Sequence, residues 1–148
     1  MKLSTRGRYG ARAMLDLALH NGEKIVLLKD IAKRQEISER YLENIMGILV
    51  SNGLATSVQG RNGGFSLTKK PSDIKLSQII QAVEGSLSPV SCIDNPKSCK
   101  RASACVTRPI WQKLKKSIFD VLASITLEDM VKMQKEKLKG DKSGMYYI

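Results

Sequence analysis

The chain has 148 residues, of which 25 are Lys or Arg and 14 are Asp or Glu, so it carries a net charge of +11. No apolar run approaches the roughly 20 residues that span a bilayer, and the first ten residues, MKLSTRGRYG, contain no apolar signal core. These features argue against a membrane protein, predict a cytoplasmic one and favour nucleic acid as its partner. With only two Phe and no RNA-binding sheet signature, double-stranded DNA is the expected form.

The first predicted helix covers residues 1–22. Ser4 or Thr5 is expected to cap its start, and Gly22 to end it. Its outer side carries three arginines, namely Arg6, Arg8 and Arg12. They form either a solvated face or a surface that lies along DNA phosphates.

The next stretch predicts two helices joined by a tight turn. Ile31 faces inward on the first helix, Glu36 and Ile37 form the turn, and Ser38 caps the second helix. Apolar residues of the second helix repeat with a period near 3.6 residues: Tyr41, Leu42, Ile45, Met46, Leu49 and Val50. Gly53 is expected to end this helix in a left-handed conformation.

The second helix presents a polar face near its start. Arg40, Glu43 and Asn44 are spaced so that they point the same way. Arg pairs best with guanine and Asn with adenine, while Glu accepts a hydrogen bond from cytosine N4. We therefore expect these three residues to read bases, with Ser38 on a phosphate. Glu43 has an alternative role, which is to reject sites by repulsion.

A hairpin follows, with strands expected at 54–58 and 65–67. Three glycines are expected to give the turn positive φ, namely Gly60, Gly63 and Gly64. Gln59 and Arg61 lie at its tip and are expected to contact the DNA backbone or minor groove. The order of elements predicts a mainly α protein with a winged helix-turn-helix. The alternative is a helical hairpin on a small sheet that binds no nucleic acid.

The second half of the chain predicts three further parts. A helix over 77–84 ends at Gly85, and an irregular loop over 86–107 contains all three cysteines. Pro109 then opens what should be the longest helix. Its apolar residues imply a dimerisation helix: Ile110, Trp111, Leu114, Ile118, Val121, Leu122 and Ile125.

Thr126 and Asp129 form a capping-box-like start for a last helix that should end near Leu138. The predicted organisation is a DNA-binding domain over 1–85, a cysteine segment over 86–107, the dimerisation and final helices over 108–138, and a flexible tail over 139–148.

The cysteines have the spacing C-x6-C-x5-C, at Cys92, Cys99 and Cys105. A cytoplasmic protein is not expected to hold disulfides, and nearby Lys100 and Arg101 would favour the thiolate form. Thiolates bind Fe–S clusters or zinc. The spacing alone leaves a cluster, zinc, a redox switch and incidental surface cysteines all open.

Several stretches together resemble the Rrf2 family of bacterial transcription regulators: MKLSTRGRYG, YLENIMGILVSNGL, GRNGGFSL, AVEG, the cysteine segment and TLEDM. The resemblance implies a winged-helix homodimer joined by the long helix, binding a palindromic operator. It also implies that Cys92, Cys99 and Cys105 hold an Fe–S cluster, [2Fe–2S] being favoured over [4Fe–4S], as in IscR-like members.

The resemblance does not extend to a fourth cluster ligand. IscR-like members have a histidine three residues after the last cysteine, where Arg108 stands here, and NsrR-like members use an N-terminal aspartate, where Arg8 stands. Asp94, a group of the partner chain or a small thiol are the open choices.

The end of the chain resembles a different branch. CymR-like members, which act with cysteine synthase, end in an aromatic pair and Ile, and this chain ends in Tyr146, Tyr147 and Ile148. The rival hypothesis is therefore a metal-free repressor of cysteine metabolism, controlled by cysteine synthase on this tail. An enzyme is not expected, because the single histidine leaves no arrangement of base and nucleophile.

Overall fold

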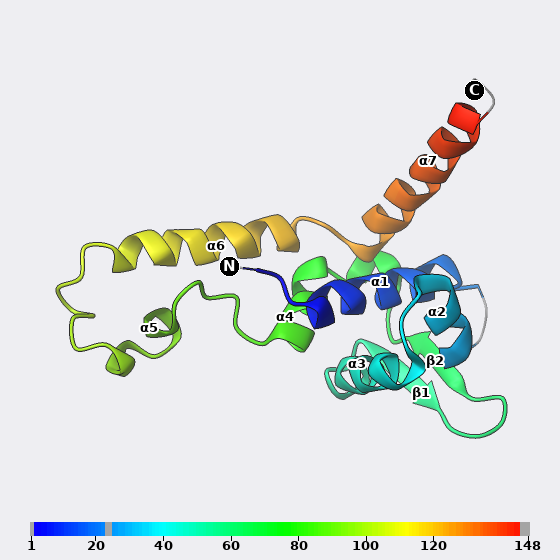
Figure 1. The fold of residues 1–148 in the computed structure, drawn as a ribbon, viewed down its shortest axis with the longest axis horizontal. Coiled ribbons are helices and arrows are strands. Elements are labelled where there is room, and N and C mark those ends of the chain that lie inside the picture. Colours follow the sequence, from blue (N-terminus) through cyan, green and yellow to red (C-terminus); the bar gives the residue numbers. More distant parts are fainter. Residues whose placement is uncertain (1, 23–24, 146–148) are drawn as a thin grey trace.

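A computed structural model describes residues 2–22 and 25–145. The elements in this part, in chain order, are α1 (Thr5–Leu19), α2 (Leu28–Gln35), α3 (Glu39–Ser51), β1 (Ala55–Val58), β2 (Gly64–Leu67), the 3-10 turn η1 (Pro71–Asp73), α4 (Leu76–Glu84), α5 (Ser91–Asp94), the 3-10 turn η2 (Pro96–Ser98), α6 (Arg108–Ala123) and α7 (Leu127–Met145). Figure 1 shows α1 to α4 and the hairpin as one body, from which α6 and α7 project in different directions. The mainly α, winged-helix fold is confirmed.

The core lies where α1, α3 and α4 meet. Its largest fully buried side chains include Met14, Leu17, Leu42, Ile45, Met46, Leu49, Ile79 and Val83. α1 approaches α4 at Gly10, where an added Cβ would lie 3.1 Å from the nearest Val83 methyl carbon. The approach depends on glycine, because a larger residue would push the two helices apart.

α1 is shorter than the predicted helix over 1–22. Ser4 caps it, since its hydroxyl oxygen accepts from the N–H of Gly7 at 3.1 Å. The helix ends at Leu19.

The helix-turn-helix is confirmed in its local details. Glu36 adopts a left-handed conformation, with φ of 55°, and makes the turn. Ser38 caps α3 by accepting from the N–H of Tyr41 at 3.2 Å. The predicted apolar stripe is wrong at Tyr41, whose exposed fraction is 37%. Tyr41 lies at the edge of the buried face, where its ring contacts that of Tyr9 in α1 edge to face.

The wing is a two-stranded antiparallel hairpin in which Val58 lies opposite Gly64. Gly60 has the predicted positive φ, 108°, but Gly63 and Gly64 do not. Glycine is required at these two positions for another reason. A Cβ on Gly63 would collide with the carbonyl oxygen of Val58, and one on Gly64 with that of Val26. Val26 also pairs with Phe65 through two backbone hydrogen bonds of 2.8 Å.

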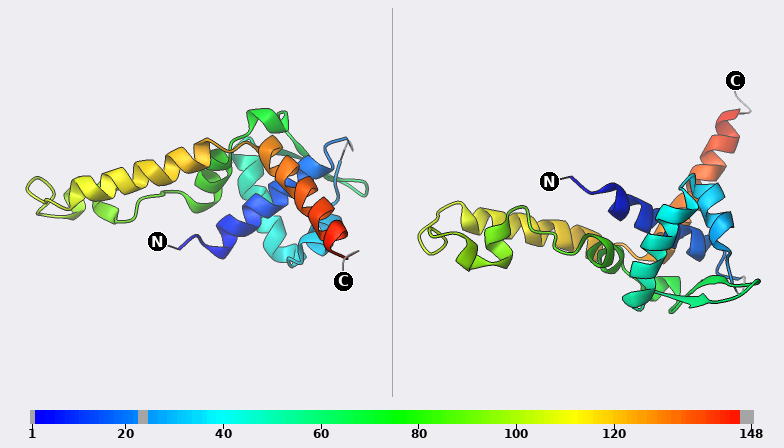
Figure 2. Two further views of the ribbon diagram at one scale, coloured as in Figure 1. Left: turned by 90° about the horizontal axis from the view of Figure 1, so that it is seen from above. Right: turned by 60° about the horizontal axis from the view of Figure 1, so that its bottom comes forward.

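The cysteine segment is more ordered than the predicted irregular loop, since it contains the single turn α5 and the turn η2. It begins after Gly85, whose φ is 80°. Figures 1 and 2 show it running beside α6 to the far end of that helix before turning back into it. Pro109 lies in the first turn of α6, as predicted.

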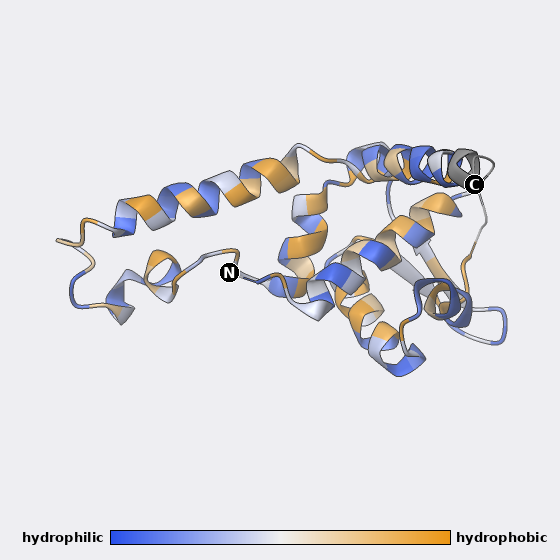
Figure 3. Ribbon diagram, turned by 45° about the horizontal axis from the view of Figure 1, so that its top comes forward, coloured by the Kyte–Doolittle hydropathy of each residue, from blue (hydrophilic) through white to orange (hydrophobic). Residues whose placement is uncertain are grey.

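α6 has no buried residue within the described chain. Hydrophobic residues recur along the length of the helix, as the colouring in Figure 3 shows. Ile110 and Val121 are 53% and 60% exposed. The helix therefore offers an apolar face that its own chain covers only in part.

α7, and not α6, is the longer of the two C-terminal helices. Thr126 and Asp129 cap it reciprocally, with hydrogen bonds of 2.9 and 3.0 Å. The predicted end near Leu138, and with it the start of the flexible tail at 139, is wrong because the helix continues to Met145. Gly140 does not stop it, since one glycine costs a helix only about 1 kcal/mol relative to Ala and the residues before it, KEKLK, are helix formers.

The described residues contain no helix that is both long enough and apolar enough to cross a bilayer.

Candidate nucleic-acid interface

The exposed start of α3 carries the predicted base-reading residues. Arg40, Glu43 and Asn44 are all exposed. Ser38, Arg40, Tyr41 and Asn44 line one hollow over the first turns of the helix. The structure thus brings Ser38, Arg40 and Asn44 together. Glu43 is exposed on the same helix but does not line the hollow. The Ser38 hydroxyl accepts from the backbone of Tyr41 and retains its proton for a further acceptor.

A second hollow joins α3 to the start of α1. It is lined by Ser4, Thr5, Arg6, Tyr41, Asn44 and Ile45. Arg6 is exposed and has no ion-pair or hydrogen-bonding partner within the described residues. Asn44 and Tyr41 line both hollows, so the start of α1 extends the surface that α3 presents. The sequence analysis did not assign Thr5 or Tyr41 to the DNA surface. The arginines that follow Thr5 were the only signal that the start of α1 contributes to it.

Gly47 continues the same face of α3. It is exposed, and nothing lies within 4 Å of the Cβ that it lacks. It follows Glu43 and Asn44 by four and three residues, so it lies one turn further along their face. The helix backbone is therefore bare at this point, and a DNA strand can approach it closely. Sequence reasoning treated this position only as part of the helix.

An aromatic contact fixes α3 against α1. The rings of Tyr9 and Tyr41 lie 5.8 Å apart at 83°, an edge-to-face arrangement. The Arg12 guanidinium carbon stands 5.2 Å from the centre of the Tyr9 ring, and its Nη2 also donates to the backbone carbonyl of Gln35. One cluster thus connects α1, α2 and α3 beside the two hollows.

An ion pair between an exposed arginine and a buried carboxylate fixes α2 on α1. Asp16 is 1% exposed and accepts hydrogen bonds from Nε and Nη2 of Arg34 at 2.9 and 2.7 Å. Gln35 donates a third bond to the same carboxylate at 3.0 Å. Removing any one of these partners would destabilise the fold, because the buried carboxylate would lose part of its pairing. An aspartate between Leu15 and Leu17 was the sequence signal for this pair.

The wing lies beside α3, and its tip points away from the helical body (Figure 2). Gln59 and Arg61 are both exposed there. Gly63 donates a backbone hydrogen bond to Gly60 at 3.0 Å, which closes the turn around Arg61. The tip therefore presents one cation on a short, closed turn.

The three cysteines are spread along the cysteine segment. Cys92 lies in α5, Cys99 directly follows η2, and Cys105 precedes α6; each is half-buried. Within residues 2–22 and 25–145, no three His, Cys, Asp or Glu side chains are grouped closely enough to hold a metal ion. The single chain therefore does not bring the three thiols together.

Two features near the last cysteine favour an anionic group there. The hydroxyl of Thr107, 3.2 Å from the sulfur, and the backbone N–H groups of Arg108 and Thr107 lower the pKa of the Cys105 thiol. The Nε atom of Arg108 is buried and has no hydrogen-bond partner among the described residues. A buried donor of this kind needs an acceptor.

Asp94, the one candidate fourth ligand named within this chain, already has other partners, and so do Arg8 and His20. Asp94 accepts from Ser86, Ser88 and Lys115, and these contacts hold the pKa of its carboxyl well below the usual range. Arg8 donates to the Thr5 hydroxyl at 3.2 Å. His20, the only histidine, contacts the backbone of Asp16 in α1. The predicted partner tail, Tyr146 to Ile148, lies outside the described residues.

Comparison with known proteins agrees with this architecture. The family described as "Rrf2: Iron-dependent Transcriptional regulator" matches residues 3–133. The HTH-type transcriptional regulator IscR of Pectobacterium atrosepticum is 41% identical over 131 residues, which cover 88% of this chain and 79% of the relative.

Two solved structures are similar over most of their length. The structure of T. potens IscR has a TM-score of 0.75 at 46% identity and matches 93% of this chain and 90% of its own. That of CymR, the global cysteine regulator of B. subtilis, has a TM-score of 0.73 at 36% identity and matches 90% and 98%. The chain therefore belongs to the Rrf2 family of winged-helix transcriptional regulators.

Proposed function

We propose that the protein is a homodimeric, sequence-specific regulator that binds a palindromic operator in double-stranded DNA and is controlled by an Fe–S cluster. The observation that carries the DNA-binding part is the hollow over the start of α3, which Ser38, Arg40 and Asn44 share. In a winged helix-turn-helix, this end of the second helix faces base edges in the major groove.

Each residue of this surface has a role that follows from its chemistry. Arg40 donates to guanine, Asn44 pairs with adenine, and Glu43 accepts from cytosine or rejects other bases by repulsion. Ser38 donates its hydroxyl proton to a phosphate, while Gln59 and Arg61 of the wing reach the backbone or the minor groove.

The homodimer is supported by the partly uncovered apolar face of α6. Trp111, Leu114, Ile118 and Leu122 are only half-buried, although they follow one another along the helix. A second copy of the same helix would cover this face, and the resulting two-fold symmetry matches a palindromic operator.

The three cysteines are ligands of the kind that an Fe–S cluster requires. Cys92, Cys99 and Cys105 would hold it as thiolates, the ligands that Fe–S clusters use, and Arg108 Nε supplies a buried donor for an anionic sulfur. When bound, the cluster supplies redox sensitivity, which zinc cannot. The segment must close for the three sulfurs to meet, so occupancy would order it. The family description as iron-dependent supports the same reading. A [2Fe–2S] cluster is favoured, and the fourth ligand is a group of the partner chain or a small thiol.

A second candidate function follows from the similarity to the cysteine regulator CymR. In that case no cluster is bound, and cysteine synthase docks on the tail formed by Tyr146, Tyr147 and Ile148. The two candidates share the DNA-binding surface and differ only in what controls it.

Two measurements on one preparation test the proposal. Duplexes selected from a random-sequence pool by the wild-type protein would provide an operator, and a visible absorption spectrum of anaerobically purified protein would report the cluster. Failure to enrich any sequence would contradict the DNA-binding part. Colourless protein that binds cysteine synthase would contradict the cluster and establish the second candidate.

A further inference from the structure

The start of α1 is attached to the end of α4. Both the backbone N–H and the hydroxyl of Ser4 donate to the same carboxylate oxygen of Glu84, the backbone bond being 3.0 Å long. Gly7 permits this approach, because a Cβ there would collide with the Glu84 carboxylate. The position of the first turn of α1 therefore depends on where Glu84 lies.

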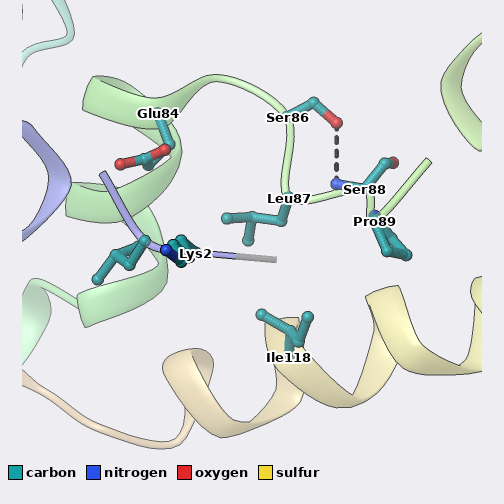
Figure 4. A pocket seen from close by; sticks show the side chains of 8 residues that line it. Lys2, Glu84, Ser86, Leu87, Ser88, Pro89 and Ile118 are labelled. Atoms are coloured by element: carbon teal, nitrogen blue, oxygen red, sulfur yellow. Dashed lines mark hydrogen bonds between the residues drawn. The ribbon is translucent and has the colours of Figure 1, made fainter. Parts of the chain in front are cut away.

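Glu84 is also the last residue of α4 before the cysteine segment. Two residues further on, Ser86 donates from its hydroxyl to Asp94, and so does Ser88 at 2.5 Å. The Ser86 hydroxyl oxygen also accepts from the backbone N–H of Ser88 at 3.1 Å. Figure 4 shows Glu84, Ser86 and Ser88 following one another along this stretch, with Lys2 nearby.

Asp94 continues the connection to the cysteines and to α6. It lies in α5, the same helical turn that contains Cys92. Its carboxylate also binds Lys115 of α6 at 2.9 Å. A change in the shape of the cysteine segment must therefore either break the Asp94 contacts or move Ser86 with it, and Gly85 alone separates Ser86 from Glu84 in the chain.

At its other end the connection reaches the candidate DNA surface. Ser4 lines the hollow that α1 shares with α3, next to Arg6 and opposite Asn44. Arg6 has no partner within the described chain, so it is available to a DNA phosphate that lies across this hollow.

We propose that the Asp94–Ser86/Ser88 and Glu84–Ser4 contacts form one connection through which the cysteine segment sets the position of Arg6 against the DNA backbone. Glu84 and Asp94 are positioning residues: neither touches DNA, and each acts through the start of α1. This inference rests on the proposed function, because it requires that α1 and α3 face DNA together.

Double-mutant cycles test the DNA end of the connection. Affinity would be measured by fluorescence anisotropy on a duplex selected by the wild-type full-length chain, and a thermal unfolding midpoint would be recorded for each variant. Glu84→Ala should weaken binding by about three- to tenfold, the size expected for a residue that changes coupling without touching the ligand. Glu84→Gln, which keeps the acceptor oxygen, should restore most of the affinity. Gln81→Ala, an exposed residue on the same helix, is the control and should bind as wild type.

The decisive comparison is between backgrounds. In an Arg6→Ala background, Glu84→Ala should produce no further loss of affinity, while its effect on the unfolding midpoint should remain. Losses that add would show that Glu84 acts through general stability and would overturn the proposal.

The cysteine end is tested with a charge-matched control. Asp94→Ala should weaken binding as Glu84→Ala does, and the two together should be no worse than either alone. Asp120→Ala removes a more exposed carboxylate from its pair with Lys116 and should leave affinity unchanged. If Asp94→Ala behaves as Asp120→Ala does, the connection is refuted while DNA binding stands.

The Asp94 measurement should be made on chelator-treated protein and on anaerobically purified protein. An effect in both preparations supports the connection. An effect confined to the anaerobic preparation would make Asp94 a cluster ligand and would overturn the connection. Wild-type protein that selects no duplex would contradict the proposed function and this inference together.

Discussion

The rings of Tyr41 and Tyr9 meet edge to face with their centroids 5.8 Å apart, which fixes the second helix of the helix-turn-helix on α1. Tyr41 lines both hollows of the candidate interface. An edge-to-face pair contributes about 0.5–1.5 kcal/mol beyond the area it buries. The contact therefore links the stability of the domain to the shape of the surface that reads DNA.

Tyr9→Leu should lower the free energy of unfolding by about 0.5–1.5 kcal/mol and weaken binding to a selected duplex, because Tyr41 loses its support. Tyr41→Phe keeps the ring and should unfold as the wild type does. Denaturant titration measures the first effect and anisotropy the second. A Tyr9→Leu variant of normal stability would show that the ring pair contributes nothing.

Gly47→Ala should change stability and binding in opposite directions. Nothing lies within 4 Å of a Cβ at Gly47, and Ala has a higher helix propensity than Gly, so the substitution should raise the free energy of unfolding by about 0.5–1 kcal/mol. The added methyl should reduce affinity, since it stands where the duplex approaches the bare backbone. Gly140→Ala in α7 is the matched control, because it also lies in open space; it should leave affinity unchanged. Equal affinity in Gly47→Ala and wild type would place this face of α3 outside the interface.

Arg61→Ala should weaken binding to every DNA sequence to a similar degree. A phosphate contact from the wing contributes through counterion release, so the slope of log K against log salt should become shallower by about one unit. Lys137→Ala, which removes an exposed charge from α7, should leave the slope unchanged. An unaltered slope for Arg61→Ala would remove that residue from the DNA contact.

Ile118→Asp should convert the protein from a dimer into a monomer in sedimentation velocity. A charge in the middle of the α6 contact would be buried without a partner, which is costly. Ser117→Asp introduces the same charge one residue away on an exposed position and should stay dimeric. A wild-type chain that sediments as a monomer would contradict the dimer, and with it the palindromic operator.

Local sequence signals predicted much of the architecture. The caps at Ser38 and at Thr126 with Asp129, the turn at Glu36 and the stop at Gly85 each depend on a residue and its immediate neighbours. The signals failed where tertiary contacts decide. Gly64 is needed because the backbone of Val26 passes close to it, and no local pattern reports that distance.

The site itself was only partly predictable. The spacing of Arg40, Glu43 and Asn44 located the exposed face of α3, since helical periodicity determines it. Whether the start of α1 belongs to the DNA surface was left open. Its position depends on the contact between Ser4 and Glu84, which are 80 residues apart and which no local pattern connects. The length of α7 was missed because Gly140 signals a helix end, whereas the helix continues through it to Met145.

The most direct test of the account is the affinity of a selected duplex for wild-type protein and for the Cys92→Ala, Cys99→Ala, Cys105→Ala triple variant, each measured anaerobically and after exposure to air. We expect the wild-type affinity to change when air removes the cluster. We expect the triple variant to fold normally and to bind with one affinity under both conditions. If wild type and triple variant bind alike both anaerobically and in air, the cysteines do not control DNA binding.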